Sequence, residues 1–288
     1  MKTIITLVTL FSILHVNAQH VESSHAPEIN KLLDDFKCYT TTMTNFHAGD
    51  LYQHSIWVAN TIAKWWEENK FWVENISKND QRLTILAGLL HDIGKAGDQK
   101  FIYENKSPHP RVGFEYVLGT RPYLPCIGDQ PWNFNNFFNA LSISPEEKQI
   151  IDIAIGMHWD LGGMILSQLQ KDPSKKDYYY DQYLTKLRCL AQEVGYHNGA
   201  IDLRLIRICL LVSAADVFGV QKVEAPYSIF NLGTPEEPHG PVKDRYYSYL
   251  YDDTGHTVRD ELVKYFTESQ AVLSQPINPE LCTKWKPS

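Results

Sequence analysis

Apolar residues recur along most of the chain with the period of an α-helix, and the strict alternation that is typical of β-strands is scarce. Residues 51–68 place apolar side chains on one helix face. Residues 82–93 form a denser apolar run, and we expect Gly94 and Gly97 to end it, because glycine accepts the left-handed conformation that closes helices. The same pattern predicts further helices over residues 112–118, 145–158, 179–194, 202–220 and 257–273.

Local signals mark one helix start and two long connections. Ser144 is followed by Pro145 and Glu147, which is the order expected of a helix that begins with a capping box. Proline and glycine recur over residues 97–143, where only a short helix is predicted, and again over residues 221–241. We therefore expect long loops in both segments.

The predicted elements fit one all-α domain rather than several domains. The chain has 288 residues, no internal repeat and no clear domain boundary. We predict a single helical bundle with long Pro/Gly-rich loops over residues 19–288. Its core covers about residues 47–220, and a C-terminal helical extension covers residues 221–288.

The first residues have the composition of a secretory signal peptide. Lys2 supplies a short basic region, residues 4–14 supply an apolar core, and residues 16–18 fit a small-residue cleavage pattern. This apolar stretch is too short to span a bilayer, and we find no other candidate membrane anchor. We predict that residues 1–18 are a signal peptide and that the protein is secreted, or lumenal or periplasmic. A buried first helix is the alternative.

Charge and cysteine content narrow the partners and the compartment. The net charge is −7 and no basic stripe occurs, so a long nucleic acid would be repelled. The five cysteines (Cys38, Cys126, Cys189, Cys209 and Cys282) include no CxxC pair, which argues against a zinc–thiolate site. In an oxidising compartment we expect one or two disulfides and at least one unpaired cysteine. The sequence does not fix an oligomeric state.

Several polar side chains lie on helix faces that are otherwise apolar. His54, His158 and Asp216 each share such a face with apolar or small residues, and His91 and Asp92 close the apolar run of residues 82–93. A single histidine in this setting is most simply a hydrogen-bonded core residue. Burying so many imidazole and carboxylate groups without partners is costly, however. A divalent cation is a partner that all of them could share.

The order of these residues resembles the HD-domain superfamily of metal-dependent phosphohydrolases, named for its adjacent His and Asp. The segment "LLHDIGK", which contains His91 and Asp92, is similar to the central motif of that superfamily. "HSIWVANTIAKW" at His54 resembles its first-histidine helix, and Asp216 matches its late aspartate. The resemblance covers about residues 47–220 and implies an HD-type helical bundle.

Two further histidines extend the resemblance to HD-GYP phosphodiesterases and CCA-adding enzymes. "HPRVGFEYVL" contains His109, and "IGMHWDLG" contains His158. In binuclear members the residues matching these two histidines hold a second metal, and the residue matching Asp92 bridges it to the first. The first metal is held by the residues matching His54, His91, Asp92 and Asp216. The chain has Trp159 after His158 and lacks a Gly-Tyr-Pro motif, so the resemblance does not extend to the cyclic-dinucleotide substrate of HD-GYP enzymes.

The resemblance implies hydrolysis of a phosphoester. We expect two divalent ions (Mn, Fe, Co, Mg or Ni) to activate water, with Asp92 as the residue that holds them. Lys95 follows one turn after His91 and is expected to meet a phosphate oxygen. Arg111 and Arg121 are further candidates for phosphate contacts, with surface charge as the simpler interpretation.

The leading hypothesis is a phosphodiesterase that acts on a small phosphorylated substrate such as a nucleotide or cyclic nucleotide. Two alternatives stay open. One is a di-iron oxygenase that resembles myo-inositol oxygenase, since a similar set of histidines and aspartates occurs there. The other is a non-catalytic protein that keeps the fold and binds a nucleotide.

Overall fold

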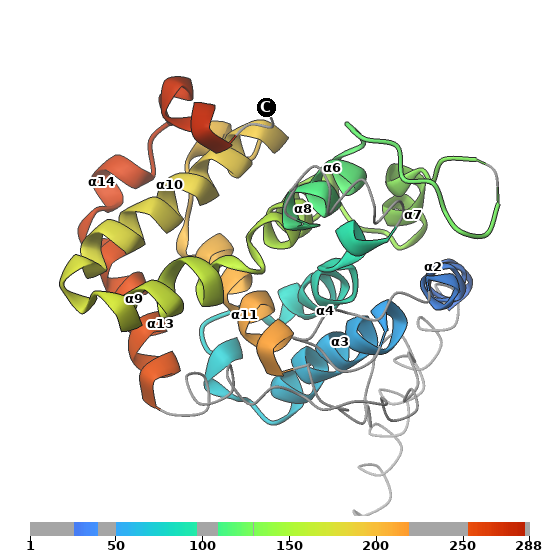
Figure 1. Cartoon of the computed structure of the whole chain (residues 1–288), viewed down its shortest axis with the longest axis horizontal. Coiled ribbons are helices and arrows are strands. Elements are labelled where there is room, and N and C mark those ends of the chain that lie inside the picture. The colour runs from blue at the N-terminus through green and yellow to red at the C-terminus, as the bar shows by residue number, and fades with distance from the viewer. Residues whose placement is uncertain (1–25, 40–49, 97–108, 129, 219–252, 286–288) are drawn as a thin grey trace, which may run out of the picture.

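The computed structural model describes residues 26–39, 50–96, 109–128, 130–218 and 253–285, and within these ranges the chain contains helices and no strand (Figure 1). The prediction of an all-α fold is confirmed. The α-helices are α2 (Ala26–Cys38), α3 (Leu51–Glu67), α4 (Gln81–Leu90), α6 (His109–Leu118), α7 (Phe134–Ala140), α8 (Pro145–Met157), α9 (Ser167–Lys171), α10 (Lys176–Val194), α11 (Leu203–Phe218), α13 (Asp253–Glu268) and α14 (Gln270–Leu273).

Four helices form the centre of the bundle. Helices α3, α4, α8 and α11 pack against one another, and apolar side chains from Ile29 to Leu273 form one continuous buried cluster. In Figure 1, α2, α6 and α7 lie on one side of this centre, and α10, α13 and α14 lie on the other. The four central helices supply most of the polar side chains that the sequence places on apolar faces.

Two of the central helices begin with capping boxes. The Ser144 side chain accepts a hydrogen bond from the Glu147 N–H, and the Glu147 side chain accepts one from the Ser144 N–H, so the predicted start of α8 is confirmed. Asp50 and Gln53 make the same reciprocal pair at the start of α3. These bonds satisfy N–H groups that have no partner within the helix.

Helix α4 ends earlier than the sequence predicted. We expected a helix over residues 82–93 that stops at Gly94, but α4 ends at Leu90 with His91 as its C-cap. Asp92 leaves the helical conformation (φ −98°, ψ 10°), and a short 3₁₀ turn, η4 (Ile93–Lys95), follows it. The prediction was wrong because the apolar pattern continues through Ile93, while the backbone leaves the helical path at Asp92.

Gly94 is needed for a close contact between η4 and α6 rather than for a left-handed turn. A Cβ atom on Gly94 would lie 2.0 Å from the His109 carbonyl oxygen and 2.6 Å from the Gly113 nitrogen. The backbones of η4 and α6 are therefore in direct contact here, with no room for a side chain between them. The first turn of α6, and His109 with it, is therefore fixed directly against the turn that follows Asp92.

Other parts of the helix pattern were incomplete. The sequence did not predict α2, α7 or α9, and the helix predicted for residues 112–118 starts at His109 as α6. The last predicted helix is divided at Ser269 into α13 and α14. A π-helix, η5 (Leu161–Leu166), follows α8, and hydrophobic periodicity could not reveal it because its period differs from that of an α-helix.

Two disulfides connect distant parts of the chain. Cys38 at the end of α2 pairs with Cys126, and Cys189 of α10 pairs with Cys282 near the C-terminus. Cys209 is unpaired and buried in α11, which confirms the prediction of at least one unpaired cysteine.

Some predictions fall on segments outside the described residues, namely the signal peptide of residues 1–18 and the connection of residues 221–241. Among the described helices, none is by itself long and apolar enough to cross a membrane, although the bent pair of α8 and residues 161–171 passes that test when taken together. The domain boundaries stay a prediction.

The contact at Gly94 leads to a test of stability. We expect Gly94→Ala to lower the free energy of unfolding by about 2 kcal/mol or more, because the added methyl group meets backbone atoms that cannot rotate away. Gly162→Ala is the matched control, since a Cβ there has no neighbour within 4 Å. Urea denaturation of both variants measures the difference. Equal stability of the two variants would show that the close contact is not needed.

Asp152 of α8 leads to a test of pH dependence. Its Oδ2 accepts a hydrogen bond from Lys148 at 2.8 Å, while its Oδ1 is buried without a hydrogen bond. Burial raises the pKa of Asp152 from 3.8 to about 7, although Lys148 opposes the shift. A raised carboxyl pKa means that the folded state binds the proton more tightly, so this stabilisation is present below pH 3.8 and is lost as the pH rises towards 7.

Asp152→Asn should remove this dependence. Relative to the parent, the variant should gain stability as the pH rises from about 4 to 7, by at most about 4 kcal/mol from the difference between the two pKa values. Thermal unfolding at pH 4, 5.5 and 7 measures the effect. A constant difference between the two proteins across this range would contradict the assignment.

Candidate metal centre

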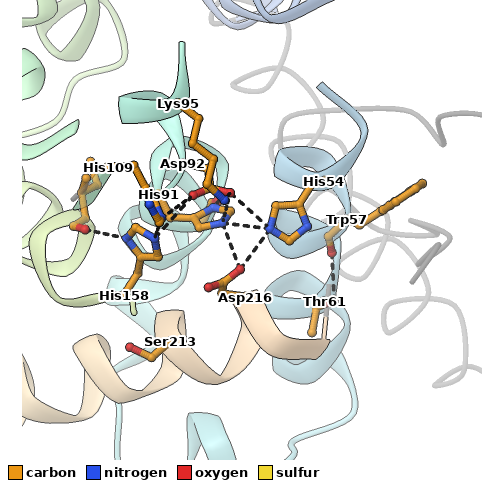
Figure 2. Close-up of polar contacts among 12 residues, drawn as sticks. His54, Trp57, Thr61, His91, Asp92, Lys95, His109, His158, Ser213 and Asp216 are labelled. Atoms are coloured by element: carbon orange, nitrogen blue, oxygen red, sulfur yellow. Dashed lines mark hydrogen bonds and ion pairs between the residues drawn. The ribbon is translucent and has the colours of Figure 1, made fainter. Parts of the chain in front are cut away.

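Six polar side chains from different elements meet in one centre (Figure 2). Four of the six lie where helices begin or end. The six are His54 of α3, His91 at the end of α4, Asp92 at the start of η4, His109 at the start of α6, His158 at the end of α8 and Asp216 of α11.

The first cluster joins two histidines to two aspartates, and all four are buried. His54 Nε2 lies 3.0 Å from Asp216 Oδ1 and 3.1 Å from His91 Nε2. His91 Nε2 in turn lies 3.3 Å from Asp216 Oδ1. The four potential ligand atoms lie within 4.8 Å of one another, close enough for one ion to contact them all.

The second cluster adds two histidines on the other side of Asp92. His109 Nε2 lies 3.0 Å from His158 Nε2, and the two nitrogens lie 3.2 Å and 3.5 Å from Asp92 Oδ1. In Figure 2 these two rings lie on the opposite side of Asp92 from His54.

The Asp92 carboxylate is shared between the clusters. Its Oδ2 lies 3.5 Å from His54 Nε2 and 3.4 Å from His91 Nε2, whereas its Oδ1 faces His109 and His158. Each oxygen therefore serves one cluster. This is the arrangement that a carboxylate bridging two cations requires.

Backbone carbonyls fix the orientation of two of the rings. His91 Nδ1 lies 2.7 Å from the Gly88 carbonyl, and His158 Nδ1 lies 2.7 Å from the Ile155 carbonyl. A carbonyl only accepts, so each Nδ1 carries the proton and donates it. In the neutral ring the Nε2 lone pair then points into the centre, which is the usual state of a metal-binding histidine.

The electrostatics of the first cluster favour a cation. Burial tends to lower the pKa of His91, but Asp92 and Asp216 together raise it to about 10. Burial lowers the pKa of His54, although Asp216 opposes this. Burial tends to raise the pKa of Asp92, but the charges of Lys95 and His91 hold it well below its ordinary value. The ionised carboxylates thus stabilise positive charge in this cluster. A divalent ion bound by the neutral imidazoles would supply that positive charge.

The donor set also fits a metal by its composition. Imidazole nitrogen and carboxylate oxygen suit Mn, Fe, Co, Ni and Zn, and thiolate is absent from the two clusters. Asp92 Oδ1 is buried and accepts no hydrogen bond, although imidazole nitrogens lie close to it. A cation between these atoms would give that oxygen a partner. The residues present therefore fit one ion in each cluster.

The centre opens on the side of His109 and Lys95. The side chains of His54, His91 and His158 are fully buried, whereas that of His109 is 24% exposed and that of Lys95 is 16% exposed. Lys95 Nζ lies 2.6 Å from Asp92 Oδ2. Burial lowers the pKa of His109 to about 4, and the charge of Lys95 adds to the effect. A substrate would approach along this side.

The two arginines considered as phosphate contacts have carboxylate partners instead. Arg111 Nε donates to Glu115 at 2.8 Å, and its terminal nitrogens donate to the two oxygens of Glu193 at 2.7 Å and 2.6 Å. Arg121 Nε lies 2.9 Å from Glu115. Both guanidinium groups therefore support α6 rather than the open side of the centre.

Sequence reasoning missed the residues of α10 that pair with the segments carrying the second cluster. Asp160 is buried, and its Oδ2 accepts a hydrogen bond from Lys186 of α10 at 2.6 Å. Burial raises the pKa of Asp160, and the charge of Lys186 opposes the shift. The spacing of Arg111 and Glu115 signals a pair on one helix, but nothing in the sequence connects α10 to either histidine.

A comparison with protein families identifies one segment of the chain. A model described as the HD domain matches residues 51–120. This segment contains His54, His91, Asp92 and His109, while His158 and Asp216 follow it in the sequence. No curated protein and no solved structure matches the chain.

The two clusters predict a metal content. The purified protein should bind two divalent ions per chain, His109→Ala should retain one, and Asp92→Ala should bind both weakly, because Asp92 serves both clusters. Elemental analysis after equilibrium dialysis measures the ratio, and His197→Ala, a histidine outside both clusters, is the control. Two tightly bound ions in His109→Ala would contradict the assignment of the second cluster.

Proposed function

Because the chain contains an HD domain and belongs to the superfamily of metal-dependent phosphohydrolases that this domain defines, we propose that it is a secreted phosphodiesterase that cleaves a small nucleotide or cyclic nucleotide. The observation that carries the proposal is the position of Asp92, which presents one carboxylate oxygen to each cluster. Such sharing suits two ions placed side by side, the arrangement that serves displacement at phosphorus.

Two divalent ions at these positions would polarise a phosphoryl group, lower the pKa of a water and offset the negative charge that builds up during the reaction. His54, His91 and Asp216 would hold one ion, and His109 and His158 the other. Asp92 would hold both. Because most of these side chains are buried, bulk water is kept from the centre, which strengthens every charge interaction within it.

Lys95 is the residue best placed to act on the substrate itself. Its ammonium group lies at the open side of the centre, beside the carboxylate that joins the clusters. A phosphoryl group bound by ions in the two clusters would lie next to the Lys95 charge. Lys95 would then stabilise a non-bridging phosphate oxygen as negative charge develops on it.

Charge and cysteine chemistry support the proposed size and location of the substrate. A chain of net charge −7 disfavours a polyanion of many phosphates but can still bind one small anion at a cationic centre. Two disulfides, together with the signal-like N-terminus, support export to an oxidising compartment. A secreted enzyme would meet nucleotides outside the cell that makes it.

The test is a substrate panel run with protein loaded with Mn, Co, Fe, Mg or Ni. The panel contains a phosphodiester, a phosphomonoester, 2′,3′- and 3′,5′-cyclic nucleotides and dinucleotides. Diester cleavage without oxygen supports the proposal. Oxygen consumption by the iron-loaded protein would support the di-iron oxygenase instead, and nucleotide binding without turnover would support a non-catalytic HD protein.

Two substitutions should separate the proposed roles. Asp92→Asn should abolish hydrolysis, and Lys95→Ala should lower kcat by about 10²-fold, which is typical when one group that stabilises the transition state is lost. Lys148→Ala is the control for Lys95→Ala, because Lys148 also pairs with a buried aspartate but lies outside both clusters. Full activity of Asp92→Asn would rule out the proposed mechanism.

A further inference from the structure

One helix contacts both elements that carry the histidines of the second cluster. Lys186 and Glu193 lie on α10, seven residues apart, which places them two turns apart on the same face. Lys186 pairs with the segment that follows His158, and Glu193 pairs with the first turn of α6, where His109 lies. Helix α10 is thus ion-paired with both segments that carry the histidines of the second cluster.

The ion pair with α6 is bidentate. Arg111, two residues after His109, donates from its terminal nitrogens to both oxygens of Glu193, at 2.7 Å and 2.6 Å. Glu115 accepts from Arg111 Nε and so holds the guanidinium plane. Two parallel hydrogen bonds fix both the direction and the distance of this contact. The first turn of α6 cannot move away from α10 without breaking them.

The ion pair with the end of α8 is more deeply buried. Asp160, two residues after His158, is 3% exposed and lies 2.6 Å from Lys186 Nζ. Asp160 also stands at the start of the π-helix η5, where the chain leaves the α-helical path. Removing the charge of Lys186 would leave a buried carboxylate without its cation, a costly state that favours displacement of this segment.

The first cluster is supported differently. His54 and His91 are fully buried on α3 and at the end of α4, among the apolar side chains of the central helices. Their positions depend on core packing, which is close to incompressible. The second cluster instead contains His109, the most exposed of the four histidine ligands, on a helix whose first turn is also held by an ion pair.

We propose that Lys186 and Glu193 of α10 are positioning residues that set the affinity of the second metal position without affecting the first. The proposal rests on the two-metal centre proposed above. Groups that hold metal ligands in place typically change metal affinity by about 10-fold to 100-fold when they are substituted. These two residues act through the segments of His109 and His158, so we expect the lower end of that range.

The experiment is a titration of the metal-free full chain with Mn²⁺, followed by equilibrium dialysis and by the electron paramagnetic resonance signal of coupled Mn²⁺ pairs. Glu193→Gln and Lys186→Gln should each weaken the second ion about tenfold, lose the signal of the coupled pair at limiting Mn²⁺ and leave the first affinity unchanged. The exchanged pair Arg111→Glu with Glu193→Arg should restore the second affinity at least in part. Arg204→Gln, which breaks a bidentate pair with Asp80 outside both clusters, is the control.

The possible outcomes are distinct. If the parent binds fewer than two Mn²⁺ ions, the two-metal centre itself fails. If the parent binds two and the α10 variants keep both affinities, the positioning role is wrong. A role in overall stability alone would lower the melting temperature and weaken both ions equally, or neither, and would also overturn the proposal.

Discussion

The structure depends on one carboxylate that is held between two pairs of histidines. Asp92 is buried and ionised, and the free energy cost of that burial requires positive charge close to it. The histidine nitrogens around Asp92 could hold cations that supply this charge. The imidazoles come from α3, α4, α6 and α8, and Lys95 adds a charge at the open side. The arrangement of the helices is thus linked to the electrostatics of a single side chain.

Much of the metal centre could be predicted from the sequence, because most of its residues are polar side chains in otherwise apolar segments. A histidine or aspartate on an apolar helix face, as at His54 and Asp216, must find a partner in the core, and helical periodicity alone locates such residues. The six side chains predicted as metal ligands do lie together. The all-α fold and the capped start of α8 follow from local rules in the same way.

What could not be predicted depends on contacts between distant segments. The early end of α4 reflects the backbone turn at Asp92, which apolar periodicity does not record. The close contact of Gly94 with Gly113 involves no side chains, so the two glycines are the only sign of it in the sequence. Arg111 and Glu193 are 82 residues apart, and their pairing emerges only once α6 and α10 are placed in space. As a result, the sequence suggested Arg111 as a possible phosphate ligand, whereas the structure pairs it with Glu115 and Glu193.

The disulfide between Cys189 and Cys282 has a consequence for how the chain can be shortened. Cys189 lies between Lys186 and Glu193 on α10, and the bond ties that helix to the C-terminal segment, where Arg188 also donates to the Gln275 carbonyl. The tail is therefore not an independent appendage, although it is remote in sequence from every ligand. Removing the C-terminal segment, or reducing this disulfide, would free α10 from one of its attachments. Because α10 carries Lys186 and Glu193, the redox state of the surroundings would then affect the positions of His109 and His158.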